Sequence, residues 1–210
     1  MRRTRSVCFV LGLVVPLVLV VHAVAQPASP AVGSQATYRW TSSVSQPVTV
    51  LVQQRDAGGR VTWSAVEERA SPPPIFMTYA VVRGDAKSYT LQIVTHEQPD
   101  GPPLSVTQVT VDRASGKALR SVISRPKGLI DTPESGLRPM REAGVPQGTR
   151  EQISVPAGTF AALRGAVQGA QVWVSDQVPV LGLVKGVWPS GTLELVRSAP
   201  TGATDLLASK

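Results

Sequence analysis

Few side chains in this sequence could do chemistry. The chain has two histidines and one cysteine, and His22 and Cys8 lie in an apolar N-terminal stretch, which leaves His96 as the one imidazole beyond it. Serine and cysteine hydrolases need a histidine base, and a catalytic zinc normally takes three protein ligands. No G-x-S-x-G turn is present. We therefore interpret His96 as a solvent-exposed histidine at a strand end and expect neither a catalytic site nor a metal site.

Carboxylate pairs are the second chemistry to weigh, because glycoside hydrolysis needs two of them. Glu67 and Glu68 are adjacent in a strand-like segment, so their side chains should point to opposite faces. Four aspartates fall in turn-like segments and suit turn capping: Asp56, Asp85, Asp100 and Asp112. A hydrolase acting through carboxylates alone is the least favoured of three functions, and its candidates are Glu67, Glu68, Asp176 and Glu194. Neither G-x-G-x-x-G nor a Walker A loop occurs, and we expect no cofactor and no enzymatic activity.

The N-terminal 25 residues have the pattern of a secretory signal peptide. They begin with three basic residues, Arg2, Arg3 and Arg5, and continue with a largely apolar run over residues 7–21. Ala23-Val24-Ala25 is a small-x-small cleavage site, which makes Gln26 the first mature residue. A membrane anchor is the alternative, but it needs about 20 apolar residues. We expect export to the periplasm or the medium, and a mature protein without cysteine and therefore without disulfides.

The remaining sequence predicts strands. The 210 residues include 18 Gly and 18 Pro, which break helices and favour short strands joined by turns. Ala36, Tyr38 and Trp40 alternate with polar residues, and turn residues near positions 57, 84 and 115 separate further strand pairs. No window of 12 or more residues has a helical apolar period free of Gly and Pro. The sequence predicts a mainly β fold with little helix, a curved antiparallel sheet, or half-barrel, of roughly ten strands.

The domain organisation follows from these segments. We predict a signal peptide at residues 1–25, a loose lead-in at 26–34, a single β domain at 35–198 and a small polar tail at 199–210. Residues 125–148 contain eight Gly and Pro and show no clean period. We expect them to form a long loop, with one helical turn at 137–143, and loops of such length are usually functional or mobile.

Positive charge gathers around this loop. Residues 113–150 hold eight basic and three acidic side chains. Such a loop could contact an anionic membrane surface or an envelope polymer, and a solvated basic face is the simpler interpretation. The candidates for this contact are Arg125, Lys127, Arg138 and Arg141. We expect no nucleic-acid partner, because the protein is exported and the loop has no interleaved aromatic residues for base stacking.

Large aromatic side chains lie mostly on the apolar stripes of the predicted strands, where packing in the core is their ordinary role. The functional alternative is that some of them line a concave apolar pocket. The candidates for that ligand-binding role are Trp40, Trp63, Tyr79, Tyr89 and Trp173.

The segment Val155-Pro156-Ala157-Gly158-Thr159-Phe160 predicts a strand, a tight turn and a second strand. It resembles the V-P-A-G-T-F element of exported bacterial domains of unknown function that are similar to the lipoprotein-localisation-factor half-barrel. Residues 172–176 and the Gly182-Leu183-Val184-Lys185 strand resemble the same group, and residues 112–117 match it more loosely. The resemblance implies a curved sheet around an apolar cavity. Carriers of this kind cover the cavity with helices, so here the 125–148 segment is the lid, or the cavity is open or filled.

Two functions stay open. The first is a non-enzymatic periplasmic binding module that holds an apolar or lipid-like ligand on the concave face. The second is a structural or adaptor protein of the cell envelope with a filled core and an envelope protein as its partner.

Overall fold

A computed structural model describes residues 30–55, 61–125, 128–132, 148–167 and 169–208. These residues form thirteen strands and no helix, which confirms the mainly β prediction. The strands are β1 (Gln35–Ser42), β2 (Gln46–Arg55), β3 (Val61–Ala70), β4 (Ile75–Gly84), β5 (Ser88–His96), β6 (Pro103–Asp112), β7 (Ala118–Arg125), β8 (Gly128–Thr132), β9 (Thr149–Val155), β10 (Gly158–Val167), β11 (Ala170–Val174), β12 (Leu183–Trp188) and β13 (Gly191–Ala199). No helix in the part of the chain described here is long and apolar enough to cross a membrane.

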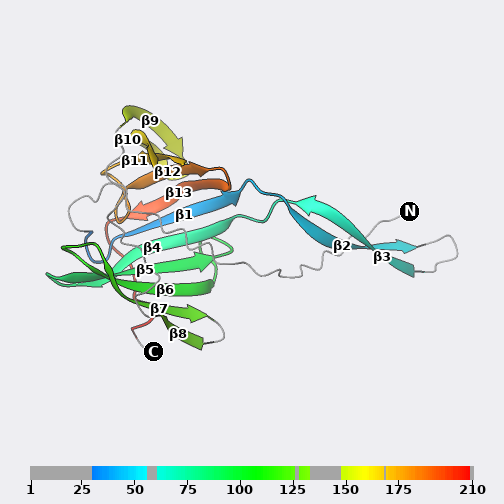
Figure 1. Ribbon diagram of the computed structural model, residues 1–210, viewed down its shortest axis with the longest axis horizontal. Coiled ribbons are helices and arrows are strands. Elements are labelled where there is room, and N and C mark those ends of the chain that lie inside the picture. The colour runs from blue at the N-terminus through cyan, green and yellow to red at the C-terminus, as the bar shows by residue number, and fades with distance from the viewer. Residues whose placement is uncertain (1–29, 56–60, 126–127, 133–147, 168, 209–210) are drawn as a thin grey trace.

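Eleven strands form one antiparallel sheet, in the order β8-β7-β6-β5-β4-β1-β13-β12-β11-β10-β9. Figure 1 shows that the sheet curves, with β8 at one edge and β9 at the other. Among the described strands these two edges do not pair with each other, so the curved open sheet predicted from the sequence is confirmed. Strand β8 lies inside the segment predicted as a long loop. The predicted helical turn at 137–143 falls outside the described residues.

The two faces of the sheet differ in chemistry. Directly paired residues of neighbouring strands point to the same face, so the register divides the side chains into two sets. The face that we call the inner face carries the apolar set, which includes Ala36, Tyr38, Tyr79, Leu91, Leu193 and Leu195. The opposite face, which we call the outer face, carries a polar set that includes Thr37, Thr78, Gln92, Gln108 and Glu194.

The loop between β11 and β12 contributes to the core. Val178 and Leu181 are buried in the same cluster as the inner-face residues. Strand β12 begins at Leu183, because Val178, Val180 and Leu181 before it pack into the core as part of a loop. The hydroxyl of buried Tyr38 donates to the carbonyl oxygen of Leu183 at 3.0 Å, which ties β1 to the start of β12.

Strands β2 and β3 form a hairpin that stands away from the sheet (Figure 1). Ten residue pairs join them, and in the described part of the chain they pair with no other strand. Strands of this length extend about 33 Å. We call residues 46–70 the ribbon arm. The main chain and hydroxyl of Ser43 donate to the carbonyls of Ser190 and Pro189, at 3.0 and 2.6 Å, and fix the chain just before the arm begins.

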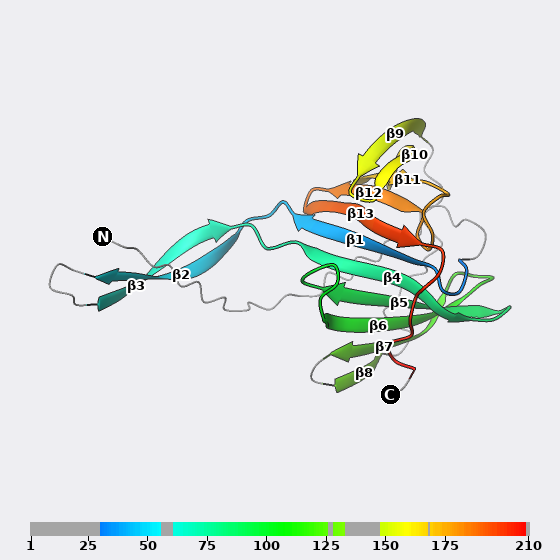
Figure 2. The same cartoon turned by 180° about the vertical axis from the view of Figure 1, so that it is seen from behind.

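The segments flanking the sheet are hydrogen-bonded to it. In the described part of the predicted lead-in, the N–H of Gly33 donates to Val81 O at 2.7 Å and the N–H of Val81 donates to Ser34 O at 2.9 Å. Ala203, in the predicted tail, donates to Gly33 O at 2.8 Å. From there the tail runs across the outer face over β4, β5 and β6, as Figure 2 shows.

Candidate functional site

Three of the five predicted ligand-contacting aromatics, Tyr79, Tyr89 and Trp173, are buried members of the hydrophobic core. Tyr79 and Tyr89 lie on the inner face and are 3% and 4% exposed. The ring of Tyr79 meets that of Tyr38 edge-on, with 5.7 Å between centroids, and the guanidinium of Arg113 lies 5.1 Å from the ring centre of Tyr89. Burial raises the pKa of Tyr79 and that of Tyr38 above the usual value for tyrosine. These side chains fill the centre of the inner face with protein.

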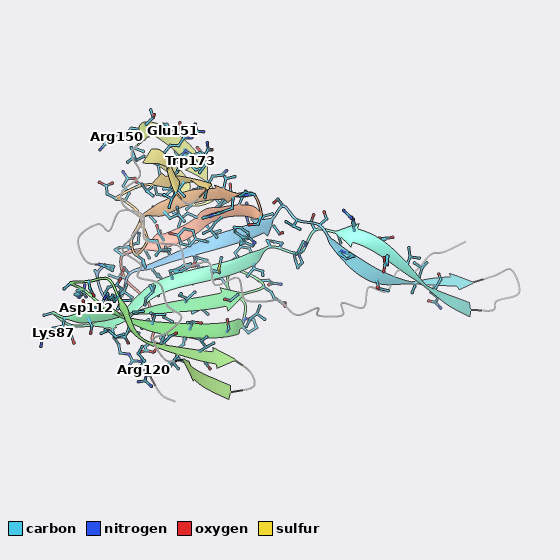
Figure 3. The ribbon with its side chains drawn as sticks, in the orientation of Figure 1. Lys87, Asp112, Arg120, Arg150, Glu151 and Trp173 are labelled. Carbon is cyan, nitrogen blue, oxygen red and sulfur yellow. The ribbon has the colours of Figure 1, made fainter. Side chains whose placement is uncertain are left out.

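Trp173 lies on the other face of the sheet. It pairs with Lys185, which pairs with Glu194 of the outer face. Its indole N–H donates to a carboxylate oxygen of Glu151, and the guanidinium of Arg164 stands 5.5 Å from the ring centre. Figure 3 shows Trp173 and Glu151 near the β9 edge of the sheet. Trp173 and Tyr79 therefore lie on opposite faces of the sheet, although both are buried residues of the hydrophobic core.

Trp63 belongs to β3 of the ribbon arm, where it pairs with Gln53. The arm stands away from the sheet, so Trp63 is also separated from the inner-face aromatics. Sequence alternation assigned all five aromatics to strands correctly. It could not show which sheet, or which face of a sheet, each strand presents.

Trp40, the fifth candidate, has a partner that the sequence analysis did not select. Its ring lies 5.8 Å from that of Trp188, and both residues are half-buried. Two glycines make room for the rings. A Cβ atom on Gly186 would lie 2.3 Å from the Trp188 ring, and one on Gly191 would lie 2.6 Å from the Trp40 ring. The Gly-x-Trp spacing of residues 186–188 is the sequence signal that could have shown this seat.

Other half-buried apolar side chains of the inner face lie in two groups. Trp40 pairs with Ile75 of β4. Ile93, Thr107 and Ile123 form a separate row across β5, β6 and β7, beside buried Tyr79. We call Trp40, Ile75, Ile93, Ile123 and Trp188 the apolar strip. Each is half-buried, whereas the core residues beside them are closed to solvent. The tryptophan end of the strip lies beside Ser43, at the root of the ribbon arm.

The outer face holds a charged row next to β1. Glu194 of β13 accepts hydrogen bonds from Arg39 at 2.8 Å and from Lys185 at 2.9 Å. Partial burial raises the pKa of Glu194, but the bonds from Arg39 and Lys185 outweigh that effect and leave the pKa below its usual value. Glu194 is thus an ionised, fully engaged carboxylate, which suits structure better than general acid catalysis.

The remaining chemical candidates do not assemble. His96 is half-buried, and its Nδ1 lies 2.8 Å from Gly101 O. Glu67 and Glu68 are exposed on the ribbon arm. Within the described ranges, no three histidine, cysteine or acidic residues lie close enough to hold a metal ion. An open depression of about 460 Å³ near the β9 edge includes Glu151 and Arg164, which lie 4.0 Å apart.

The predicted anionic-surface contact falls mainly on residues that are not described. Lys127, Arg138 and Arg141 lie outside the described ranges, and Arg125 is described for its main chain, as the last residue of β7. Of the other basic residues in 113–150, Arg120 and Arg150 lie on opposite sides of the curved sheet (Figure 3). In the described part of this segment, Arg120 and Arg150 therefore do not form one basic patch.

No known protein family matches this chain, and neither a curated protein nor a solved structure shows significant similarity to it.

Proposed function

We propose that this protein is an exported, non-enzymatic binding module that holds an apolar or lipid-like ligand against the apolar strip. The observation that carries the proposal is the strip itself, which consists of two groups of half-buried apolar side chains on the inner face. Trp40, Ile75 and Trp188 lie near the ribbon arm, and Ile93 and Ile123 lie in the row that contains buried Tyr79. Exposed apolar surface on a curved face is a usual mark of a binding site.

The packing of the tryptophan end of the strip supports a ligand-binding role. Gly186 and Gly191 allow the Trp188 and Trp40 rings to lie close to the main chain, where the two rings are inclined at 55° to each other and their exposed sides present an apolar surface. Covering such surface contributes about 25 cal/mol per Å². The tight turn predicted after Val155 joins β9 to β10, where Gly158 has a φ of 132°.

A titration with a fluorescent fatty-acid probe tests the site, together with native mass spectrometry of the purified protein for bound lipid. Ile123 and Val122 are adjacent on β7, are both half-buried and point to opposite faces. Ile123→Ser should weaken probe binding about tenfold because it removes apolar contact. Val122→Ser is the matched control and should bind as the wild type does. Absence of probe binding to the wild type, or equal effects of the two substitutions, would contradict the proposal.

The export proposal has its own test. The sequence of residues 1–25 supports cleavage after Ala25. The intact mass of protein recovered from the periplasm or medium should correspond to a chain beginning at Gln26. A mass that retains residues 1–25 would overturn it.

The ribbon arm favours a second candidate function, that of an adaptor in the cell envelope. A two-stranded hairpin in water is marginally stable alone, and residues 64–70 of the arm are exposed. A mature chain without cysteine allows clean single-cysteine crosslinking. Ser64→Cys on the arm should crosslink to an envelope protein in cells, whereas Ser198→Cys, exposed on β13, serves as the control. Equal labelling from both positions would count against the adaptor role.

A further inference from the structure

The outer face contains two buried amide side chains that need hydrogen-bond partners. Gln92 of β5 and Gln108 of β6 pair directly across the strands and are 2% and 7% exposed. The Nε2 of Gln108 donates to Oε1 of Gln92 at 3.0 Å, and the guanidinium of Arg83 donates to Oε1 of Gln108 at 3.1 Å. Buried amides are almost always hydrogen-bonded, so this row of three side chains demands a polar occupant above it.

The C-terminal tail, residues 200–208, provides that occupant. Nε2 of Gln92 donates to the carbonyl oxygen of Thr204 at 3.0 Å, and Oε1 of Gln92 accepts the N–H of Leu206 at 2.9 Å. One side-chain amide thus bonds the main chain of residues i and i+2, just before the turn at residues 206–208. This contact involves main-chain atoms of the tail and does not depend on the identity of residues 204 and 206.

The residue between them supplies a charge. Oδ1 of Asp205 accepts from Nε2 of Gln108 at 2.7 Å and from the N–H of Leu207 at 3.0 Å, and Arg83 forms an ion pair with the other oxygen. Burial raises the pKa of Asp205, but these contacts outweigh it and hold the pKa below its usual range. The position favours an ionised carboxylate at the start of a turn.

We propose that Arg83, Gln92 and Gln108 form a binding site for an acidic peptide segment, which the C-terminal tail occupies in cis and a segment of a partner protein occupies after displacing it. This inference is independent of the apolar strip, since the site lies on the outer face. Its specificity is for a main chain held on both sides of a central acidic side chain, with a turn directly after that side chain.

The tail is suited to displacement. Its contacts with the site are polar, and the side chain after Asp205, Leu206, is 41% exposed and adds little apolar burial. Gly202, with a φ of 96°, begins the crossing segment and allows a change of direction that other residues resist. A tethered tail competes at an effective concentration in the millimolar range, so a partner must either bind tightly or act when the tail is loosened.

The test uses the full-length chain and a fluorescein-labelled peptide with the sequence of residues 202–208, GATDLLA. Asp205→Ala should loosen the tail and strengthen peptide binding at least tenfold over the wild type, as measured by fluorescence anisotropy. Asp100→Ala, which breaks a different acidic contact with Arg197, is the matched control and should leave peptide binding at the wild-type level. A peptide with alanine in place of aspartate should bind at least tenfold more weakly.

Two further measurements decide the remaining outcomes. Addition of Gln92→Leu to Asp205→Ala should abolish peptide binding, and in the wild type an excess of unlabelled peptide should speed amide hydrogen exchange at Leu206. Equal peptide binding by Asp205→Ala and wild type, with unchanged exchange at Leu206, would overturn the proposal. Dimers that form in place of peptide uptake would assign the site to the tail of a second copy and would also overturn it.

Discussion

The two faces of this one sheet are buried in different ways. The inner face is covered by apolar side chains and by the loop that carries Val178 and Leu181, through contacts that have no required direction. Part of the outer face is covered by a tail that is held through directed hydrogen bonds to Gln92 and Gln108. Apolar burial tolerates many side-chain arrangements, whereas a buried amide fixes its partner's position and chemistry. This difference is the reason why we propose an apolar ligand for the inner face and a specific peptide for the outer face.

The largest expected effect is a difference in unfolding free energy between a substitution on the inner face and one on the outer face. Leu91 on the inner face is 1% exposed, and its neighbour Thr90 on the outer face is half-buried. Leu91→Ala should lower the free energy of unfolding by about 2–5 kcal/mol because it leaves a cavity. Thr90→Ala should change it by less than about 0.5 kcal/mol. Urea unfolding followed by circular dichroism measures both, and similar losses would contradict the division into faces.

Glycine substitutions at the tryptophan seat should have the next largest effect. Gly186→Ala places a Cβ against the Trp188 ring and should cost about 1–3 kcal/mol of unfolding free energy, as overpacking does. It should also shift the tryptophan emission. Gly101→Ala, where a Cβ would meet ordinary contacts at 3.4 Å, is the control and should unfold as the wild type does. If Gly186→Ala has the unfolding free energy and tryptophan emission of the wild type, the glycine does not hold the Trp188 ring in place, and that part of the ligand-binding proposal is wrong.

Alkaline pH should lower the free energy of unfolding that the buried tyrosines of the inner face contribute. Burial raises the pKa of Tyr38 and of Tyr79, so the folded state keeps protons that the unfolded state releases above its pKa of about 10. The stability from these neutral tyrosines is therefore complete below that pH and is lost as the pH rises further. Tyr38→Phe should flatten this dependence, at a cost of about 1 kcal/mol for the bond to Leu183. A pH series of urea unfolding checks it, and an unaltered slope in the variant would contradict the assignment.

Acid pH should lower the free energy of unfolding that the outer-face carboxylates contribute, and this is the smallest of the expected effects. The pKa values of Glu194 and Asp205 lie below their usual range, because hydrogen bonds to basic and amide groups outweigh partial burial. The stability from both carboxylates is present above the unfolded pKa of about 4 and is lost as the pH falls through the folded values. Asp205→Asn should reduce this loss and speed exchange at Leu206. If Asp205→Asn unfolds with the same dependence on acid pH as the wild type, the Asp205 carboxylate does not contribute to stability, and the prediction is wrong.

Local sequence patterns predicted the strands well, for specific reasons. Alternation at Ala36, Tyr38 and Trp40 marks β1 because a strand places successive side chains on opposite faces. Asp112 and Gly116 mark the β6–β7 turn, where the side chain of Asp112 accepts from Ser115 and Gly116 has a φ of 69°. Strand β8 was missed, because five residues among many glycines and prolines carry too short a pattern.

The candidate sites were predicted less completely. The sequence selected Trp40 but not its partner Trp188, and it grouped Tyr79 with Trp63 and Trp173, which lie in different places. The tail site had no local signal at all. Gln92 and Gln108 look like ordinary polar positions of alternating strands until the fold brings residues 204–206 over them.

The sequence by itself determined the β class, most strand positions and the small number of catalytic side-chain types, because these depend on residue types and on contacts within a few positions. Only the tertiary structure decided that β1 pairs with β4 and β13, that the ribbon arm stands apart, and that the tail crosses the outer face. Those choices rest on contacts between residues far apart in the sequence, such as Gln35 with Ala80, Gln92 with Thr204 and Tyr38 with Leu183. Their free energy belongs to the pairing, and no local pattern in either segment records it.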